Sequence, residues 1–302
     1  MFSLDLFGFR ANWSPIYFLS LVLLLVGYYF LVYKFYFRFN DGKRGTIKQV
    51  LFFTTGIIVL YIIKGGPLDL LGHIMFYAHM IQMAVLYLVV PPLLILGIPE
   101  WFWRFILNKP VIKQLFGLIT KPLIALVLFN GFFSIYHIPI IFDVIKTDMW
   151  LHAGYTSILF VFSIAMWWPL LTTLPEYQTL SGLKKIGYIF ANGVLLTPAC
   201  ALIIFAEETI FASFSDPNAW GQALALCVPV STLSSLNLSG PEMFSSMAPL
   251  QDQRLGGVLM KIIQEIVYGV ILAHTFFSWY NSERENEKEE LALYQQQPRP
   301  SE

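Results

Sequence analysis

The chain contains seven stretches of mostly apolar residues, each of about the length that a membrane-crossing helix requires. A spanning helix needs about 20 such residues to cross about 30 Å of hydrocarbon. Helices satisfy their own backbone hydrogen bonds in lipid, whereas an open sheet edge cannot. We therefore predict an all-α, polytopic membrane protein with transmembrane helices near residues 15–34, 48–64, 73–97, 121–137, 151–171, 186–206 and 256–280.

The composition agrees with this prediction and excludes several functions. Only 13% of the 302 residues are charged and 57% are hydrophobic, whereas soluble domains carry about 25% charged residues. The formal net charge is zero, so overall charge does not indicate a nucleic-acid partner. The sequence shows no nucleophile with a base, no phosphate-binding loop and no zinc-protease motif, and we do not expect an enzyme.

Basic residues are concentrated in alternate connections between the predicted spans. The connections after spans 1 and 3 are rich in lysine and arginine, and the connection after span 5 carries Lys184 and Lys185, whereas the others carry one each. Positively charged loops remain on the cytoplasmic side. This pattern predicts an N-terminus outside and a C-terminus inside.

The chain is predicted to form one transmembrane domain, residues 1–280, followed by a charged and flexible cytoplasmic tail, residues 281–302. Residues 219–233 are apolar but short for a span and contain Pro229. They are consistent with a re-entrant segment, an interfacial segment or an eighth span, and an eighth span would place the tail outside.

The two cysteines give no clear signal. Cys200 lies in the sixth predicted span and Cys227 in the long segment that follows it. Two isolated cysteines specify neither a disulfide nor a metal site. Their arrangement favours a structural role for both.

The stretch "HIMFYAHMIQM", residues 73–83, concentrates histidine and methionine at the start of the third span. On one continuous helix all five of these side chains would share one arc, and three of them would stack at i, i+4 and i+8. Polar groups within hydrocarbon are functional candidates. The residues are His73, Met75, His79, Met80 and Met83.

Two further histidines, His137 and His152, lie at the predicted outer ends of spans 4 and 5. Imidazole and thioether together suit copper, Cu(I) most of all. Asp69, Asp143 and Asp148 flank the same surface and could orient the histidines. The predicted copper ligands are His73, His79, Met83, His137 and His152, with Met75 and Met80 as auxiliaries.

A structural interpretation of the same residues remains open. Methionine often fills gaps in an apolar core, and membrane histidines can simply form hydrogen bonds between helices. Lys261 and Glu265, four residues apart in span 7, form either a self-satisfied ion pair or a site for a proton, a metal or a partner helix. Asp252, just before that span, is a further candidate.

Several short motifs in order resemble the CtaG family of cytochrome c oxidase assembly factors, from about residue 13 to residue 275. The resemblance implies that this chain is a multi-span membrane protein that supplies copper to a caa3-type oxidase, at the copper centre next to the catalytic haem. The motifs are "NWSP", "GGPLDLLG", "AHMIQM" with "PPLLILGIP", "YHIP", "WLHAGY", "MWWPLL" and "DQRLGGVLM".

The resemblance can be carried over residue by residue. His79 matches the histidine of the family's H-M-x-Q motif, His137 that of its H-x-P motif, and His152 the first histidine before W-W-P. Asp252 and Gln253 match its D-Q pair. The resemblance thus implies functional roles for these five positions.

The chain departs from the family pattern at two positions, Met83 and Thr156, where many members have histidine. Methionine retains a soft ligand, whereas threonine removes one. The departures favour a loose site that passes copper on over a closed site that retains it.

The sequence therefore predicts a bacterial plasma-membrane assembly factor for a haem–copper cytochrome c oxidase. It would bind copper at the outer face and assist its delivery to the catalytic copper centre. The predicted partner is the oxidase subunit that carries the haem–copper site, and the copper donor is not specified. A haem-binding electron carrier, a transporter and a metal-free assembly scaffold are the alternatives.

Overall fold

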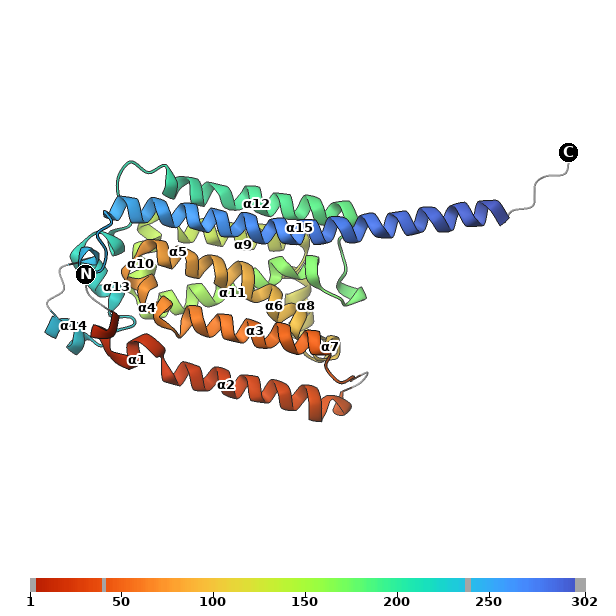
Figure 1. Ribbon diagram of the computed structural model, residues 1–302, viewed down its shortest axis with the longest axis horizontal. Helices are drawn as coiled ribbons and strands as arrows, with labels where there is room; N and C mark the ends of the chain where they lie inside the picture. The colour runs from red at the N-terminus through yellow and green to blue at the C-terminus, as the bar shows by residue number, and fades with distance from the viewer. Residues whose placement is uncertain (1–3, 40–41, 237–239, 297–302) are drawn as a thin grey trace.

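The computed structural model describes residues 4–39, 42–236 and 240–296, and within these ranges the chain is helical and contains no strand. The long helices form a bundle in which they lie side by side (Figure 1). They are α2 (Pro15–Phe30), α3 (Ile47–Lys64), the continuous span Phe76–Gly97 that consists of α5 (Phe76–Ala84), a π-helical turn and α6 (Val90–Gly97), and α9 (Pro122–Tyr136), α11 (Met149–Leu171), α12 (Gly182–Ile204) and α15 (Pro249–Gln296). Shorter helices connect them: α1 (Gly8–Trp13), α4 (Pro67–Ile74), α7 (Glu100–Leu107), α8 (Pro110–Ile119), α10 (Pro139–Thr147), α13 (Pro217–Leu224) and α14 (Val230–Leu236).

The all-α, polytopic class is confirmed. Six helical segments in the described ranges are long and apolar enough to cross a membrane, and α8 with α9 makes a seventh if this pair, bent by 75°, counts as one span. The third span begins at Phe76 and not at residue 73, because the helix is interrupted at Met75. The fourth predicted span corresponds to α9, which has only 15 residues.

Proline positions explain where many of these helices begin. The backbone N–H groups in the first turn of a helix have no intrahelical partners. Proline, which lacks this N–H, therefore loses no hydrogen bond there. The helices that start on proline are α2, α4, α8, α9, α10, α13 and α15.

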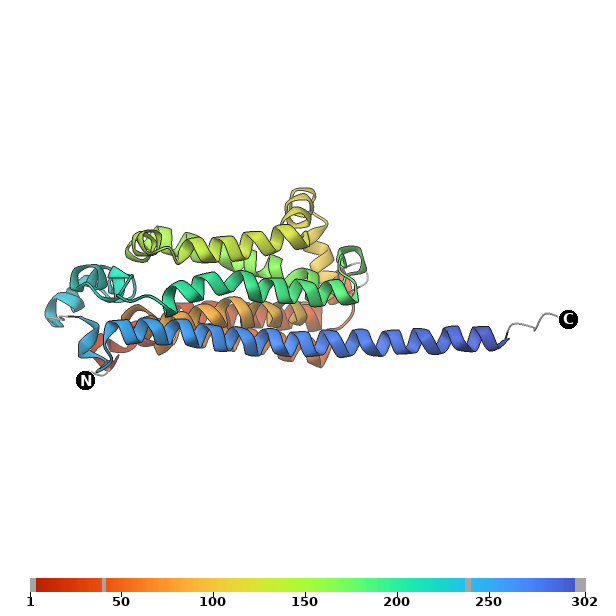
Figure 2. The same cartoon turned by 90° about the horizontal axis from the view of Figure 1, so that it is seen from above.

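The two ends of the bundle differ. We call the end that carries α4, α10, α13 and α14 the capped end; there α13 packs against both α4 and α10 (Figure 1). The described N-terminal helix α1 also lies there, whereas α15 leaves the bundle at the opposite end (Figures 1 and 2). The positions of α1 and of the end of α15 at opposite ends of the bundle agree with an odd number of membrane crossings. The side of the membrane on which each end lies stays a prediction.

The segment 219–233 belongs to the capped end. Its described residues lie in α13, α14 and the turn between them, and none of the candidate spans includes them. Trp220, Leu224 and Val228 pack with Leu70 and Ile74 of α4 in one buried cluster. The segment therefore covers the end of the bundle and does not cross it as a single helix.

The helix α15 is longer than the predicted seventh span. It continues to Gln296, beyond residue 280, where the charged tail was expected to begin. This extension projects past the other helices (Figure 2). The flexibility of residues 281–302 stays a prediction.

The bundle core holds a backbone carbonyl that proline leaves without an intrahelical donor. Pro91 has no N–H for the carbonyl four residues earlier, at Tyr87, and a π-helical turn, Val85–Val89, precedes it. Ser163 and Trp167 of α11 donate hydrogen bonds to this carbonyl, the indole at 3.0 Å. An unpaired carbonyl inside a membrane bundle is costly, so these two side chains fix α11 against the third span.

We expect Ser163→Ala to destabilise the protein by about 1 kcal/mol, because the Tyr87 carbonyl loses one donor. In a Pro91→Ala background the alanine supplies the missing backbone N–H, which can serve that carbonyl, so the same substitution should cost less. Unfolding of the four proteins of this double-mutant cycle in detergent measures the difference. An equal cost in both backgrounds would contradict this role of Ser163.

Candidate metal centre

The break between α4 and α5 corrects the prediction of one continuous helix through residues 73–83. Met75 adopts an extended conformation with φ −122° and ψ 134°, so His73 and His79 lie on two different helices. The single arc of five side chains, which assumed regular helical rotation, is therefore wrong. No proline or glycine adjoins Met75 in the sequence, so the local signal for a break is absent.

Partners from distant segments satisfy the backbone groups that this break exposes. The Asp252 carboxylate at the start of α15 accepts hydrogen bonds from the N–H groups of Phe76 and Tyr77, at 2.8 and 2.9 Å. The Trp220 indole donates to the Ile74 carbonyl at 3.2 Å. A negative charge at a helix N-terminus also interacts favourably with the helix dipole. Asp252, predicted as a site candidate, thus caps α5.

Gln253, the second member of the D-Q pair, connects two other segments. Its side-chain oxygen accepts a hydrogen bond from the Ile210 N–H at 2.8 Å, and its amide donates to the Ile203 carbonyl at 3.4 Å. It therefore holds the segment that follows α12 against the start of α15.

Four segments bring the predicted histidines to the capped end. His73 lies on α4, His79 on α5 and His137 directly after α9, and these three side chains are buried. His152 lies in the first turn of α11 and is partly buried. All four histidines thus lie at one end of the bundle, and their position on the outer side of the membrane stays a prediction.

The four rings form two pairs. His73 and His152 are in contact, with ring centroids 5.6 Å apart. His79 and His137 lie on the same tyrosine ring, that of Tyr136, at centroid distances of 6.0 and 5.1 Å. Among the described residues, no three of these histidines bring ring nitrogens within 4.8 Å of one another. They gather in one region but do not form a closed metal cage.

Several ring nitrogens in this region are buried and have no hydrogen-bond partner among the described residues: His79 Nε2, His137 Nε2 and His152 Nδ1. His137 Nδ1 lies 2.7 Å from the Phe133 carbonyl, which can only accept a hydrogen bond. The proton therefore sits on Nδ1, and the lone pair remains on Nε2. A carbonyl that fixes the tautomer in this way is typical of metal-binding histidines.

Lys146 of α10 also lies in this region, although the sequence analysis did not predict it as a site residue. Its side chain is fully buried, and its ammonium nitrogen lies 3.5 Å from His79 Nδ1 and 3.3 Å from the Gly72 carbonyl. Burial lowers the pKa of Lys146 to about 7. The carbonyls at the C-terminus of α4 carry partial negative charge, which favours a cation at this position.

A second polar group adjoins the histidines at α4. Asp69, His73 and Cys227 place one ligand atom each within 4.8 Å of one another. The Asp69 Oδ1 atom accepts hydrogen bonds from Lys64 Nζ, at 2.8 Å, and from Gln82 of the H-M-x-Q motif. Burial raises the pKa of the Cys227 thiol to about 12, so the free thiol is protonated. The sequence favoured a structural role for Cys227 because it gave no indication of these neighbours.

The three methionines separate at the helix break. Met75 packs in the buried cluster that contains Ile74 and Trp220, whereas Met80 and Met83 belong to the main core. A Cβ atom built on Gly256 of α15 would lie 3.0 Å from Met80 Cγ. Met80 thus faces α15. The predicted stack of Met75, His79 and Met83 along one helix is not formed, because Met75 lies before the start of α5.

Asp143 and Asp148 hold backbone segments in place. Asp143 accepts hydrogen bonds from the N–H groups of Ala212 and Ser213, at 3.0 and 2.9 Å, and Asp148 accepts one from the Leu151 N–H at 2.8 Å. In the described residues these contacts replace the histidine-orienting role predicted for the two carboxylates. Asp69, in contrast, lies near His73.

Lys261 and Glu265 form the ion pair that their spacing predicts, at 2.7 Å. Lys261 also donates a hydrogen bond to Thr197 of α12 at 2.9 Å. The Glu265 side chain is 61% exposed on the outer surface of the bundle. This geometry matches the self-satisfied ion pair.

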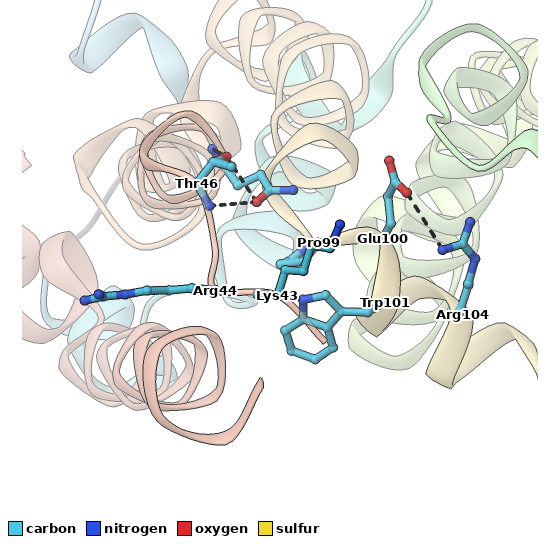
Figure 3. Close-up of a pocket in the computed structure, with 8 residues that line it drawn as sticks. Lys43, Arg44, Thr46, Pro99, Glu100, Trp101 and Arg104 are labelled. Carbon is cyan, nitrogen blue, oxygen red and sulfur yellow. Dashed lines mark hydrogen bonds and ion pairs between the residues drawn. The ribbon is translucent and has the colours of Figure 1, made fainter. Parts of the chain in front are cut away.

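The opposite end of the bundle has a different character. A hollow of about 490 Å³ there is lined by basic side chains, Lys43, Arg44 and Arg104, beside Trp101 (Figure 3). Arg104 forms an ion pair with Glu100 at 3.9 Å, as drawn in Figure 3. The basic residues from which the cytoplasmic side was predicted thus gather at this end, and its side of the membrane stays a prediction.

Comparison with known proteins identifies the family. The family model for the cytochrome c oxidase caa3 assembly factor (Caa3_CtaG) matches residues 26–282. The chain therefore belongs to the caa3 assembly factor family, a class of multi-span membrane proteins to which the helical bundle conforms. No curated protein and no solved structure matches the chain.

We expect Asp252→Ala to destabilise the protein by about 1–2 kcal/mol, because two N–H groups of α5 lose their acceptor. Hydrogen exchange should accelerate at Phe76 and Tyr77. Asp216→Ala is the matched control, because Asp216 caps the exposed start of α13 in the same way. Unchanged exchange at α5 in Asp252→Ala would contradict the capping role.

Proposed function

We propose that this assembly factor binds copper at its capped end and assists delivery of the ion to the catalytic copper centre of a caa3-type oxidase. The observation that supports this most directly is the set of buried ring nitrogens without hydrogen-bond partners at His79, His137 and His152. An unsatisfied buried polar atom is costly and usually has a functional reason. A bound cation would supply the missing partner.

The donor set favours copper over harder ions. Imidazole nitrogens predominate, and Met83 supplies a thioether one turn after His79 on α5. Nitrogen and sulfur donors suit copper, whereas carboxylate-rich sites suit magnesium, calcium or manganese. Because the histidines form two pairs and not one cage, the arrangement suits temporary binding of a cargo ion.

The predicted topology puts this site on the side where copper would be inserted. The capped end lies opposite the basic end, so the positive-inside rule assigns it to the outer face of the bacterial plasma membrane. The oxidase subunit that carries the haem–copper site is the proposed recipient.

A metal-free scaffold is the second candidate, and one observation favours it. The Lys146 amine lies 3.5 Å from His79 Nδ1; when protonated it can only donate a hydrogen bond there, which places the ring proton on Nε2 and leaves that nitrogen without a lone pair for a metal. On this alternative, the histidines serve packing and hydrogen bonding, and the protein acts on the oxidase through its helix surfaces alone.

The haem-binding alternative is not supported by the arrangement of the rings. His73 and His152 are in direct contact at 5.6 Å between centroids, which leaves no space for a porphyrin between them. A Soret band in the visible spectrum of the purified protein would restore this alternative.

We expect His79→Ala to lower the copper bound per purified protein molecule and the oxidase activity of cells that carry the variant. His274→Ala is the matched control, because His274 is exposed on α15 far from the capped end. Metal analysis of the purified proteins, together with oxidase assays of membranes, makes the comparison. Normal copper content with low oxidase activity in His79→Ala would favour the metal-free scaffold, and normal values of both would exclude this site.

A further inference from the structure

The group of Asp69, His73 and Cys227 is a second candidate for metal binding; it shares His73 with the predicted histidine and methionine ligands and adds Asp69 and Cys227. Asp69 and His73 are four residues apart on α4 and therefore share one face of the helix. Cys227 approaches from the turn after α13, 158 residues later than Asp69. All three ligand atoms lie within 4.8 Å of one another, close enough to bind one ion after small side-chain movements.

Neighbouring groups already orient these ligands. The His73 Nδ1 atom lies 3.1 Å from the Ala223 carbonyl, so this nitrogen carries the proton and Nε2 carries the lone pair. The Oδ1 atom of Asp69 is held by Lys64 and Gln82, while its Oδ2 atom lies 3.9 Å from the Cys227 sulfur. Metal ligands held by such outer contacts are typical of formed sites.

The position of this group relative to the surface also differs from that of the inner histidines. Asp69 and Cys227 are partly exposed, whereas His73 and His79 are 2% and 1% exposed. The His73 ring contacts the ring of His152. An ion on Cys227 and His73 would therefore lie between the exterior of the capped end and the buried histidines.

We propose that Cys227, with His73 and Asp69, binds Cu(I) first and transfers it inward to the buried histidines through the shared ligand His73. The choice of copper rests on the proposed function, whereas the site itself rests on the geometry. A thiolate and an imidazole are soft donors that suit Cu(I). On binding, the thiol proton is released, a sulfur–copper bond forms and no electron is transferred.

The test uses the full-length protein in detergent, loaded with Cu(I) without oxygen in competition with a chromophoric chelator. We expect Cys227→Ser to weaken Cu(I) binding at least about tenfold and to lower the sulfur contribution to the copper X-ray absorption spectrum. Cys200→Ser is the matched control, because Cys200 is buried in α12. Cu(I) should also protect Cys227 from alkylation by a maleimide.

The His79→Ala variant separates this inference from the proposed function. Retention of sulfur-bound copper in His79→Ala would support the Cys227 site, even if delivery to the oxidase fails. Copper binding that depends on His79, shows no sulfur neighbour and is unchanged in Cys227→Ser would overturn the inference and leave the proposed function intact. Protection of Cys227 by Zn(II) but not by Cu(I) would overturn the assignment of the ion.

Discussion

The capping of α5 by Asp252 is the interaction on which the arrangement of the capped end depends. A helix that starts within a membrane bundle exposes N–H groups that lipid cannot satisfy. The carboxylate from α15 accepts two of them, so the chain can interrupt its third span at Met75 without an unpaired backbone. This break allows α4 to turn aside, and His73 and His79 then approach their neighbours from different directions.

The architecture could largely be predicted from the sequence, because span length and apolar composition depend on the bilayer and not on details of packing. The clustering of His137 and His152 near His79 could also be predicted from the sequence. Each of the three histidines lies at the end of its predicted span that faces the outer side. The break at Met75 could not be predicted, because its determinant, Asp252, is far away in sequence. Nothing in the sequence indicated that the Lys146 side chain is buried.

The family motifs divide into two kinds of residue. His79 and His137 have ring nitrogens left free, which is the property of potential ligands. Gln82 and Gln253 have their polar groups engaged by backbone or side-chain partners and hold segments together. A sequence match does not distinguish the two kinds. Only the hydrogen bonds in the structure separate the residues that could bind an ion from those that hold segments of the chain in place.

The buried amine of Lys146 has a consequence for how long an ion would remain. Two positive charges in surroundings of low dielectric constant repel each other more strongly than in water. An ion held by His79 would share its surroundings with the ammonium whenever that amine carries its proton. On the proposed function, this repulsion would shorten the residence time of an ion at His79, and a recipient that binds the ion more tightly could withdraw it without a separate trigger.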